Sequence, residues 1–365
     1  MKRLFSLCCS LILLSLLLVG CNNPTPSPAA YGSGNTTTTS QIVATGNFQE
    51  FALPQKNSGL MRPAVDHEGR IWLGEMGKNY LAVFDPRTKT FQQITPPHGM
   101  DGIMGIAVAA DDTIWFAEQT ANYIGHYFPT GRQFRVYPLP TLAVPDPTSA
   151  HKTLSLPSAP NDLALDAHGN VWFTELNADS LAMLDVQTGT IKQFPLSAHR
   201  SVQKLYPYGI TVDSHGIVWF TESSNSRLGR LDPQTGQISY FTPPDTTGPL
   251  MEVTGDAQGN IWATSFSSGL LLSYNPHTHT FKSYHATIKG EGAGGIYGVI
   301  AATGGEIWVA LTSENAIARL DVAANHFTFY PIPTQASLPF GLVMAPDHAI
   351  WFTEAGCDKI GMLQP

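Results

Sequence analysis

The stretch VWFTESSNSRLGRLDPQTGQISYFTPP, residues 218–244, is nearly repeated by VWFTELNADSLAMLDVQTGTIKQFPLS at residues 171–197. The same context surrounds every tryptophan of the chain, and each tryptophan follows an Ile or a Val. The seven positions, at intervals of 43 to 57 residues, are Trp72, Trp115, Trp172, Trp219, Trp262, Trp308 and Trp351. A repeat of this period indicates one architecture built from seven copies of a single unit.

Each repeat contains four short β-like runs separated by turn residues. Around Trp219 the runs are YGITVD, IVWFTE, RLGRLD and QISYFT, divided by SHG, SSNS and PQTG. This alternation predicts strands and tight turns and leaves no room for a long helix. Four strands in about 45 residues are typical of a propeller blade, in which one large aromatic fills the wedge between neighbouring sheets. We therefore predict an all-β fold, a seven-bladed β-propeller of four-stranded antiparallel blades.

The two ends of the repeat array predict how the ring closes. The last repeat, IWFTEAGCDKIGMLQP, stops after its third strand, whereas NFQEFALP at residues 47–54 matches the fourth strand of a repeat. We expect this N-terminal strand to complete the last blade, because a ring closed in this way leaves no open sheet edge between its first and last units. The predicted propeller spans residues 47–365.

The first 46 residues have the composition of an export and anchoring segment. A basic start and an apolar run end in LVGC at residues 18–21, which resembles the lipobox of bacterial lipoproteins. We predict a signal peptide over residues 1–20, lipidation of Cys21, and a flexible tether rich in Ser, Thr, Pro and Gly over residues 21–46. The protein would then be exported and held at the extracytoplasmic side of the cell membrane. An ordinary signal peptide or an anchor helix is the alternative.

Composition narrows the classes of partner. The net charge is −8, only 13% of residues are charged, and no basic block occurs, so we expect no nucleic-acid partner. Four cysteines are present, but removal of residues 1–20 and lipidation of Cys21 would leave only Cys357, which excludes an intrachain disulfide. We expect a monomer stabilised by the packing of its apolar residues.

Numbering each repeat from its tryptophan as position zero locates a candidate site at one mouth of the central channel. We expect position −11 of the innermost strand to lie opposite position +3 of the next strand, on the face that also carries the connections between blades. Position −11 is occupied by Met61, Met104, Asn161, Tyr208, Met251, Tyr297 and Phe340. Position +3 is a carboxylate in five repeats: Glu75, Glu118, Glu175, Glu222 and Glu354.

A mostly apolar ring beside carboxylates suits a small, largely apolar ligand with a few polar groups, or a protein partner from the cell envelope. The same pattern is consistent with side chains that plug the axis and carboxylates that accept hydrogen bonds from their own loops. Glu75 and Glu354 are the candidate ligands for Mg²⁺ or Ca²⁺.

Several residues of this face are also candidates for acid–base chemistry. They are Tyr208, Glu354, and His199 and His285 in connections between blades, and no sequence spacing fixes a partner for either histidine. His67, His168, His215 and His348 fall in the first turn of their repeats, so we expect them on the opposite face as solvated turn residues.

The repeated WFTE…N.IGR pattern, PYGI at residues 207–210, LPFGL at 338–342 and CDKIG at 357–361 resemble the streptogramin B lyase (virginiamycin B lyase) family. The resemblance covers residues 47–365. It implies a seven-bladed propeller and, for the family's enzymes, a magnesium-dependent elimination that opens a cyclic depsipeptide antibiotic, with a histidine as general acid or base.

This chain departs from the family at the positions that carry the chemistry. The key histidine of the last blade corresponds to Phe340, a second histidine to Tyr297, a first-blade tyrosine to Met61, and an acidic residue to Leu338. Phe340 cannot abstract a proton. We therefore expect ligand or partner binding without lyase chemistry. The alternatives are a metal-dependent lyase that uses a loop histidine, a gluconolactonase-like lactone hydrolase, and an envelope scaffold.

Overall fold

The computed structural model describes residues 35–37, 39–97, 102–145, 153–196, 204–244, 248–288 and 295–365. These residues belong to one compact unit that begins at Gly34. Every helix or strand assigned within these ranges is a β-strand, as predicted. None of the described segments forms a helix with the length and apolar character needed to cross a membrane.

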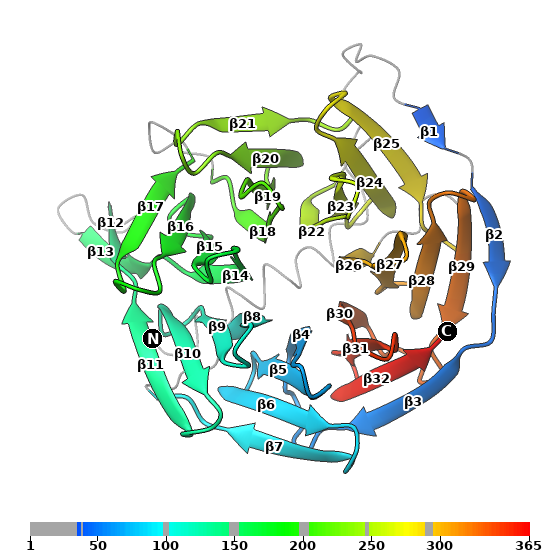
Figure 1. Cartoon of the computed structure of the whole chain (residues 1–365), viewed down its shortest axis with the longest axis horizontal. Coiled ribbons are helices and arrows are strands. Elements are labelled where there is room, and N and C mark those ends of the chain that lie inside the picture. The colour runs from blue at the N-terminus through cyan, green and yellow to red at the C-terminus, as the bar shows by residue number, and fades with distance from the viewer. Residues whose placement is uncertain are drawn as a thin grey trace. The chain divides into compact units, whose positions relative to one another are not determined.

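Seven four-stranded antiparallel blades form a ring (Figure 1). Blade 1 contains β4 (Leu60–Val65), β5 (Ile71–Glu75), β6 (Tyr80–Asp85) and β7 (Thr90–Ile94), and blade 2 contains β8 (Ile103–Val108), β9 (Ile114–Glu118), β10 (Tyr123–Phe128) and β11 (Gln133–Pro138). Blade 3 contains β14 (Pro160–Leu165), β15 (Val171–Glu175), β16 (Ser180–Leu184) and β17 (Ile191–Pro195), and blade 4 contains β18 (Pro207–Val212), β19 (Val218–Glu222), β20 (Arg227–Leu231) and β21 (Ile238–Phe241).

The other three blades follow the same order, with the innermost strand first. Blade 5 contains β22 (Leu250–Gly255), β23 (Ile261–Ser265), β24 (Leu270–Asn275) and β25 (Thr280–His285), and blade 6 contains β26 (Ile296–Ala301), β27 (Glu306–Leu311), β28 (Ala316–Asp321) and β29 (His326–Pro331). Blade 7 contains β30 (Pro339–Met344), β31 (Ile350–Glu354), β32 (Lys359–Gln364) and, as its outer strand, β3 (Asn47–Ala52). The innermost strands contact one another in sequence, and β30 contacts β4, so the ring is closed.

The predicted closure is confirmed. Strand β3 pairs antiparallel with β32 from Asn47↔Gln364 to Ala52↔Lys359, so the first and last parts of the ring share one sheet. Phe51 on β3 lies 4.6 Å, centroid to centroid, from Phe84 of blade 1 and also stacks on Trp351 of blade 7. The closing strand therefore also fills the gap between the first and last blades.

The structured part begins earlier than the sequence indicated. Residues up to 46 were expected in a tether, but β1 (Asn35–Thr37) pairs in parallel with β25, and β2 (Ser40–Val43) pairs in parallel with β29. The SQIV segment of β2 is β-prone, and the outer edges of blades 5 and 6 offer unpaired backbone groups. The expected signal peptide and Cys21 lie outside the described residues.

A hairpin separates blades 2 and 3. Its strands, β12 (Thr141–Pro145) and β13 (Thr153–Pro157), pair antiparallel in a sheet of their own. The sequence indicated only a long connection in this region, because two short segments rich in Pro and Leu carry no repeat signal.

The seven tryptophans fill the spaces between neighbouring blades, as the repeat pattern predicts. Each indole is buried and packs against apolar residues of the following blade, as Trp72 does with Ile103, Ile114 and Phe116 of blade 2. In blades 1, 3, 4 and 5 the indole N–H also donates to an aspartate six residues earlier, as in the 2.7 Å bond from Trp262 to Asp256. The indole thus links the wedge between blades to the first turn of its own blade.

Candidate functional site

A β-bulge in every innermost strand determines which side chains reach the channel. Position −12, not −11, pairs with position +3, as Leu60 does with Glu75, and pairing resumes at Pro63↔Leu73. The expected register was therefore off by one residue. The bulge leaves positions −11 and −10 out of the regular pairing, and contacts described below show that both reach across the axis.

The seven side chains at position −11 are here called the axial ring, and several of them contact one another. The hydroxyls of Tyr208 and Tyr297 are 2.5 Å apart, and Tyr297 meets the edge of Phe340 at a centroid distance of 4.6 Å. Asn161 donates to the carbonyl of Tyr208 at 3.2 Å and accepts a hydrogen bond from Gln119. Every ring side chain is 7% exposed or less. The axial ring is a packed layer of thioethers and aromatics with its few polar groups bonded to one another.

Position −10 holds a second, charged layer that the sequence pattern did not single out. Arg62 of blade 1 forms ion pairs with Asp162 of blade 3 and Glu252 of blade 5, which we call the axial ion network. Asp162 also accepts the backbone N–H of Ile210 at 2.8 Å. Burial raises the pKa of Asp162, and Arg62 opposes that shift.

The other four members of position −10 are glycines: Gly105, Gly209, Gly298 and Gly341. A Cβ on any of them would press on the backbone of the next blade, as at Gly298 against the carbonyl of Phe340. At position −10, glycine therefore lets the backbones of neighbouring blades approach closely in four blades. The other three blades carry the charged side chains of the axial ion network.

The five glutamates at position +3 are fully buried, and in four blades a group of the same blade donates to the carboxylate. Glu75 accepts from Gln93 at 2.6 Å, and Glu175 accepts from Ser180 and Gln193. The remaining donors are the backbone N–H groups of Thr120 and Ala121 for Glu118, and the side chains of Asn225 and Arg227 for Glu222. These four carboxylates therefore accept hydrogen bonds within their own blades, which is the structural role that the sequence left open as the alternative to ligand binding.

Glu354 is the exception among the five. Neither of its carboxyl oxygens has a hydrogen-bond donor among the described residues, and it faces another carboxyl, Glu50 of the closing strand. Burial, reinforced by the nearby Glu50, raises the pKa of Glu354 to about 8. Burial also raises the pKa of Glu75, against the hydrogen bond from Gln93.

The donor set does not fit a magnesium or calcium site at this mouth. Within the described residues, no group of three or more His, Cys, Asp or Glu side chains is placed to hold a metal ion. Glu75 is bonded within blade 1, and Glu354 faces Glu50 rather than a set of oxygen ligands. Hard divalent cations take six or more oxygen ligands, and the axial ring offers mainly sulfur and aromatic carbon.

The one candidate histidine within the described residues, His285, is not brought to the axis. His285 is the last residue of β25, the fourth strand of blade 5, where it pairs with Leu270. His199 lies outside the described residues. The two remaining acid–base candidates, Tyr208 and Glu354, lie in different layers, the axial ring and the position +3 glutamates.

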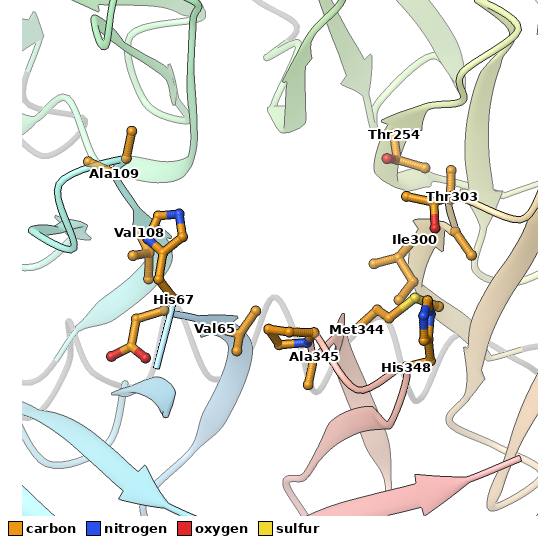
Figure 2. Close-up of a pocket in the computed structure, with 15 residues that line it drawn as sticks. Val65, His67, Val108, Ala109, Thr254, Ile300, Thr303, Met344, Ala345 and His348 are labelled. Carbon is orange, nitrogen blue, oxygen red and sulfur yellow. The ribbon is translucent and has the colours of Figure 1, made fainter. Parts of the chain in front are cut away.

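A cavity of about 750 Å³ opens at the other mouth of the channel, among the first turns of the blades. Figure 2 shows Val65 and Val108 on one side and Ile300 and Met344 on the other, with Thr254 and Thr303 nearby. Its wall is mainly aliphatic.

Two of the histidines expected as solvated turn residues line this cavity. His67 and His348 are both exposed, which agrees with that expectation, and the His67 ring lies 2.8 Å from Asp112. The sequence numbering assigned the candidate site to the axial ring and gave no signal for a cavity here, because short aliphatic residues at strand ends are also ordinary core residues.

Comparison with known families gives one match that covers most of the chain. The virginiamycin B lyase family matches residues 31–286 and, in a second, overlapping match, residues 147–365. A search of curated proteins found no significant match.

Solved structures of the same fold superpose closely. A streptogramin B lyase structure has a TM-score of 0.74 and 25% identity, covering 87% of this chain and 97% of its own. A catalytically inactive virginiamycin B lyase from Staphylococcus aureus with quinupristin has a TM-score of 0.75 and 24% identity, covering 88% and 99%. The extracellular domain of a putative hybrid two-component system from B. thetaiotaomicron has a TM-score of 0.65 and 16% identity, covering 88% of this chain and 40% of that one, and shows the fold alone.

Proposed function

Because this chain belongs to the virginiamycin B lyase family, we propose that it is an exported, membrane-anchored binding protein that uses the family's channel without the family's lyase chemistry. One observation carries the proposal. The positions expected to hold the family's catalytic side chains hold Phe340, Tyr297 and Met61, which pack in the axial ring. An elimination needs a base within hydrogen-bond reach of the substrate, and neither the phenyl ring of Phe340 nor the thioether of Met61 can serve as that base.

The axial ring is the binding surface that we propose. Thioether side chains such as Met61 and Met251 have several rotatable bonds and adapt to irregular apolar partners. The hydroxyls of Tyr208 and Tyr297 and the amide of Asn161 supply a few polar groups, which suits a largely apolar ligand with hydrogen-bonding substituents. Since the ring is packed, binding requires these side chains to rearrange.

Export and anchoring are supported by the sequence of the N-terminal segment. The apolar run ending in LVGC at residues 18–21 is typical of a lipidated, exported protein, with Cys21 as the modified residue. Lipid attachment would be tested by mass spectrometry of the N-terminal peptide from membranes. Loss of membrane association in Cys21→Ser is the expected result, and an unchanged membrane fraction without acyl mass would contradict it.

The binding proposal is tested with intact ligands. The full-length chain in detergent would be titrated with quinupristin, other cyclic depsipeptides and lactones by calorimetry, and each mixture would then be analysed by mass spectrometry. We expect saturable binding of at least one compound, recovered intact. Ring opening of any compound, or no saturable binding across the set, would contradict the proposal.

Matched variants distinguish the two mouths of the channel. Phe340→Ala removes a ring side chain, whereas Ala301→Trp fills the cavity beside Ile300. We expect Phe340→Ala to weaken binding tenfold or more and Ala301→Trp to leave it within twofold, with thermal unfolding confirming that both variants fold. If Ala301→Trp weakened binding and Phe340→Ala did not, the ligand would bind in the cavity at the other mouth instead of at the axial ring.

A further inference from the structure

In blades 1, 3 and 7, one side chain of the outer strand lies against the buried glutamate at position +3, and we call this outer-strand position the slot. Blade 7 has a different type of residue in the slot. In blades 1 and 3 the fourth strand places a glutamine, Gln93 or Gln193, against the buried glutamate at position +3. The register across the three outer strands is the same in both blades. In blade 1, Gln93 of the fourth strand pairs with Ala82 of the third strand, and Ala82 pairs with Leu73 at position +1 of the second strand. In blade 7 the same register, Glu50↔Gly361, places a carboxyl in the slot.

The carboxyl pair Glu50–Glu354 therefore lacks the amide donor that its counterparts have. Glu354 is fully buried, and both of its oxygens and Oε1 of Glu50 have no hydrogen-bond donor among the described residues. Two ionised carboxylates in one dry slot repel each other, whereas a pair that shares one proton forms a hydrogen bond.

Few other charged groups face the pair. Lys359 of β32 lies 4.0 Å from Glu50 Oε2 and donates to Thr334 at 2.7 Å, and its charge partly opposes the raised pKa of Glu354. Asp358, in the preceding turn, accepts the backbone N–H groups of Asn57 and Ser58. Burial of Glu354 outweighs the charge of Lys359, so Glu354 is the member to which we assign the proton.

The position of the pair gives it a consequence for the whole ring. Glu50 lies on β3, the strand that completes blade 7, and Glu354 lies on β31 of the same blade. The rest of the ring is joined blade to blade along the chain, but here the connection depends on the side-by-side pairing of β3 with β32. A repulsion between Glu50 and Glu354 would act across this joint.

We propose that the carboxyl pair Glu50–Glu354 is a proton-dependent latch of the propeller: one shared proton holds the closing strand on blade 7, and loss of that proton loosens the closure. The occupant of the slot is a proton and not a divalent cation. The proposal is independent of ligand binding at the axial ring.

The direction of the pH effect follows from linkage. With its pKa raised to about 8, folded Glu354 keeps a proton that the unfolded chain, with an ordinary value of 4.5, has lost. The folded state then binds more protons than the unfolded state between these two values, so stability falls as pH rises. The contribution is fully present below about pH 4.5 and is lost as pH rises through about 8.

The test is hydrogen exchange of β3 and β32 in the full-length chain from pH 6 to 9, corrected for the intrinsic exchange rate. We expect protection of residues 47–52 to fall at least tenfold more than that of β6 and β7 in blade 1, where Gln93 fills the slot. Glu50→Gln, which recreates the slot of blades 1 and 3, should abolish the extra loss. Glu354→Gln should do the same and serves as the second variant if the first folds poorly.

A reciprocal variant and a metal control complete the design. Gln93→Glu places a carboxyl pair in blade 1 and should make the exchange of β7 pH-dependent over the same range. Equal pH dependence in the wild-type chain and both Gln variants would overturn the latch. So would restoration of protection at pH 9 by 5 mM Mg²⁺ or Ca²⁺ in the wild-type chain alone, because the slot would then be a cation site.

Discussion

Tyr208 of blade 4 and Tyr297 of blade 6 meet hydroxyl to hydroxyl at 2.5 Å, although blade 5 lies between them in the ring. The contact is possible because the bulge in each innermost strand frees position −11 from regular pairing. Complete burial raises the pKa of Tyr297 well above its ordinary value. The Tyr297 phenol is therefore neutral at physiological pH, and its contact with Tyr208 is a hydrogen bond between two hydroxyls rather than a source of a Tyr297 phenolate.

Tyr297→Phe should lower the free energy of unfolding by about 1 kcal/mol, because it removes one buried hydrogen bond and keeps the aromatic contact with Phe340. Urea unfolding would measure the change. Tyr80→Phe, at a half-buried tyrosine of blade 1, is the matched control and should stay within about 0.5 kcal/mol. Equal effects in the two variants would contradict the assignment of energy to the Tyr208 contact.

Asp256→Ala should lower the free energy of unfolding by about 2–3 kcal/mol, because it leaves the buried indole N–H of Trp262 without an acceptor and removes three hydrogen bonds of the first turn. Asp232→Ala is the control, since Asp232 accepts only turn N–H groups in an exposed turn. It should cost about 1 kcal/mol or less. Similar losses in both variants would show that the indole bond contributes little.

Gly229→Ala should destabilise blade 4 by about 2–4 kcal/mol, because the added Cβ would overlap the ring of Phe220, which packs over this glycine. Gly255→Ala tests whether any glycine-to-alanine change in a strand has this effect. Its added Cβ would be 3.8 Å from Ile261, an ordinary contact, so we expect a change within about 0.5 kcal/mol. Thermal unfolding of the two variants side by side distinguishes overlap from a general backbone effect.

His126 should make stability depend on pH in the opposite direction to the carboxyl pair. Its ring stacks on Trp115 at 3.6 Å, and burial lowers its pKa to about 4. The unfolded chain, with a value of 6.5, binds a proton that the folded chain does not, so stability falls as pH drops from about 6.5 to about 4. The loss should be on the order of 2–3 kcal/mol.

The repeats supply the variant for this test. Met183 and Met362 occupy the position opposite the tryptophan in blades 3 and 7, so His126→Met should preserve the packing and remove this acid slope in urea unfolding between pH 4 and 6.5. Persistence of the slope in the variant would assign it to other groups.

The fold was predictable because one large residue per repeat performs the same task in every blade. The tryptophan context indicated the number of blades, and the absence of a fourth strand after the third strand of the last repeat predicted the closure by β3. The register of the inner strands could not be predicted to the residue, because a bulge changes the pairing without leaving a mark on strand-forming sequence, as at Met61.

The site was only partly predictable, because its contacts join distant blades. The sequence identified the axial ring but not the bridge from Arg62 to Asp162 and Glu252, since ring geometry alone brings blades 1, 3 and 5 together. It identified Glu354 but not Glu50, which lies in the sequence before the first blade and reaches blade 7 only through closure.

The parallel strands β1 and β2 have a mechanical consequence. Strands β1, β2 and β3 pair with the outer strands of blades 5 and 6 and with β32 of blade 7, in that order. A pulling force applied at the N-terminal end of β1 would detach β1 from β25 and then β2 from β29 before it loaded the pairing of β3 with β32. The two added strands would thus act as sacrificial bonds that protect the closed ring from tension.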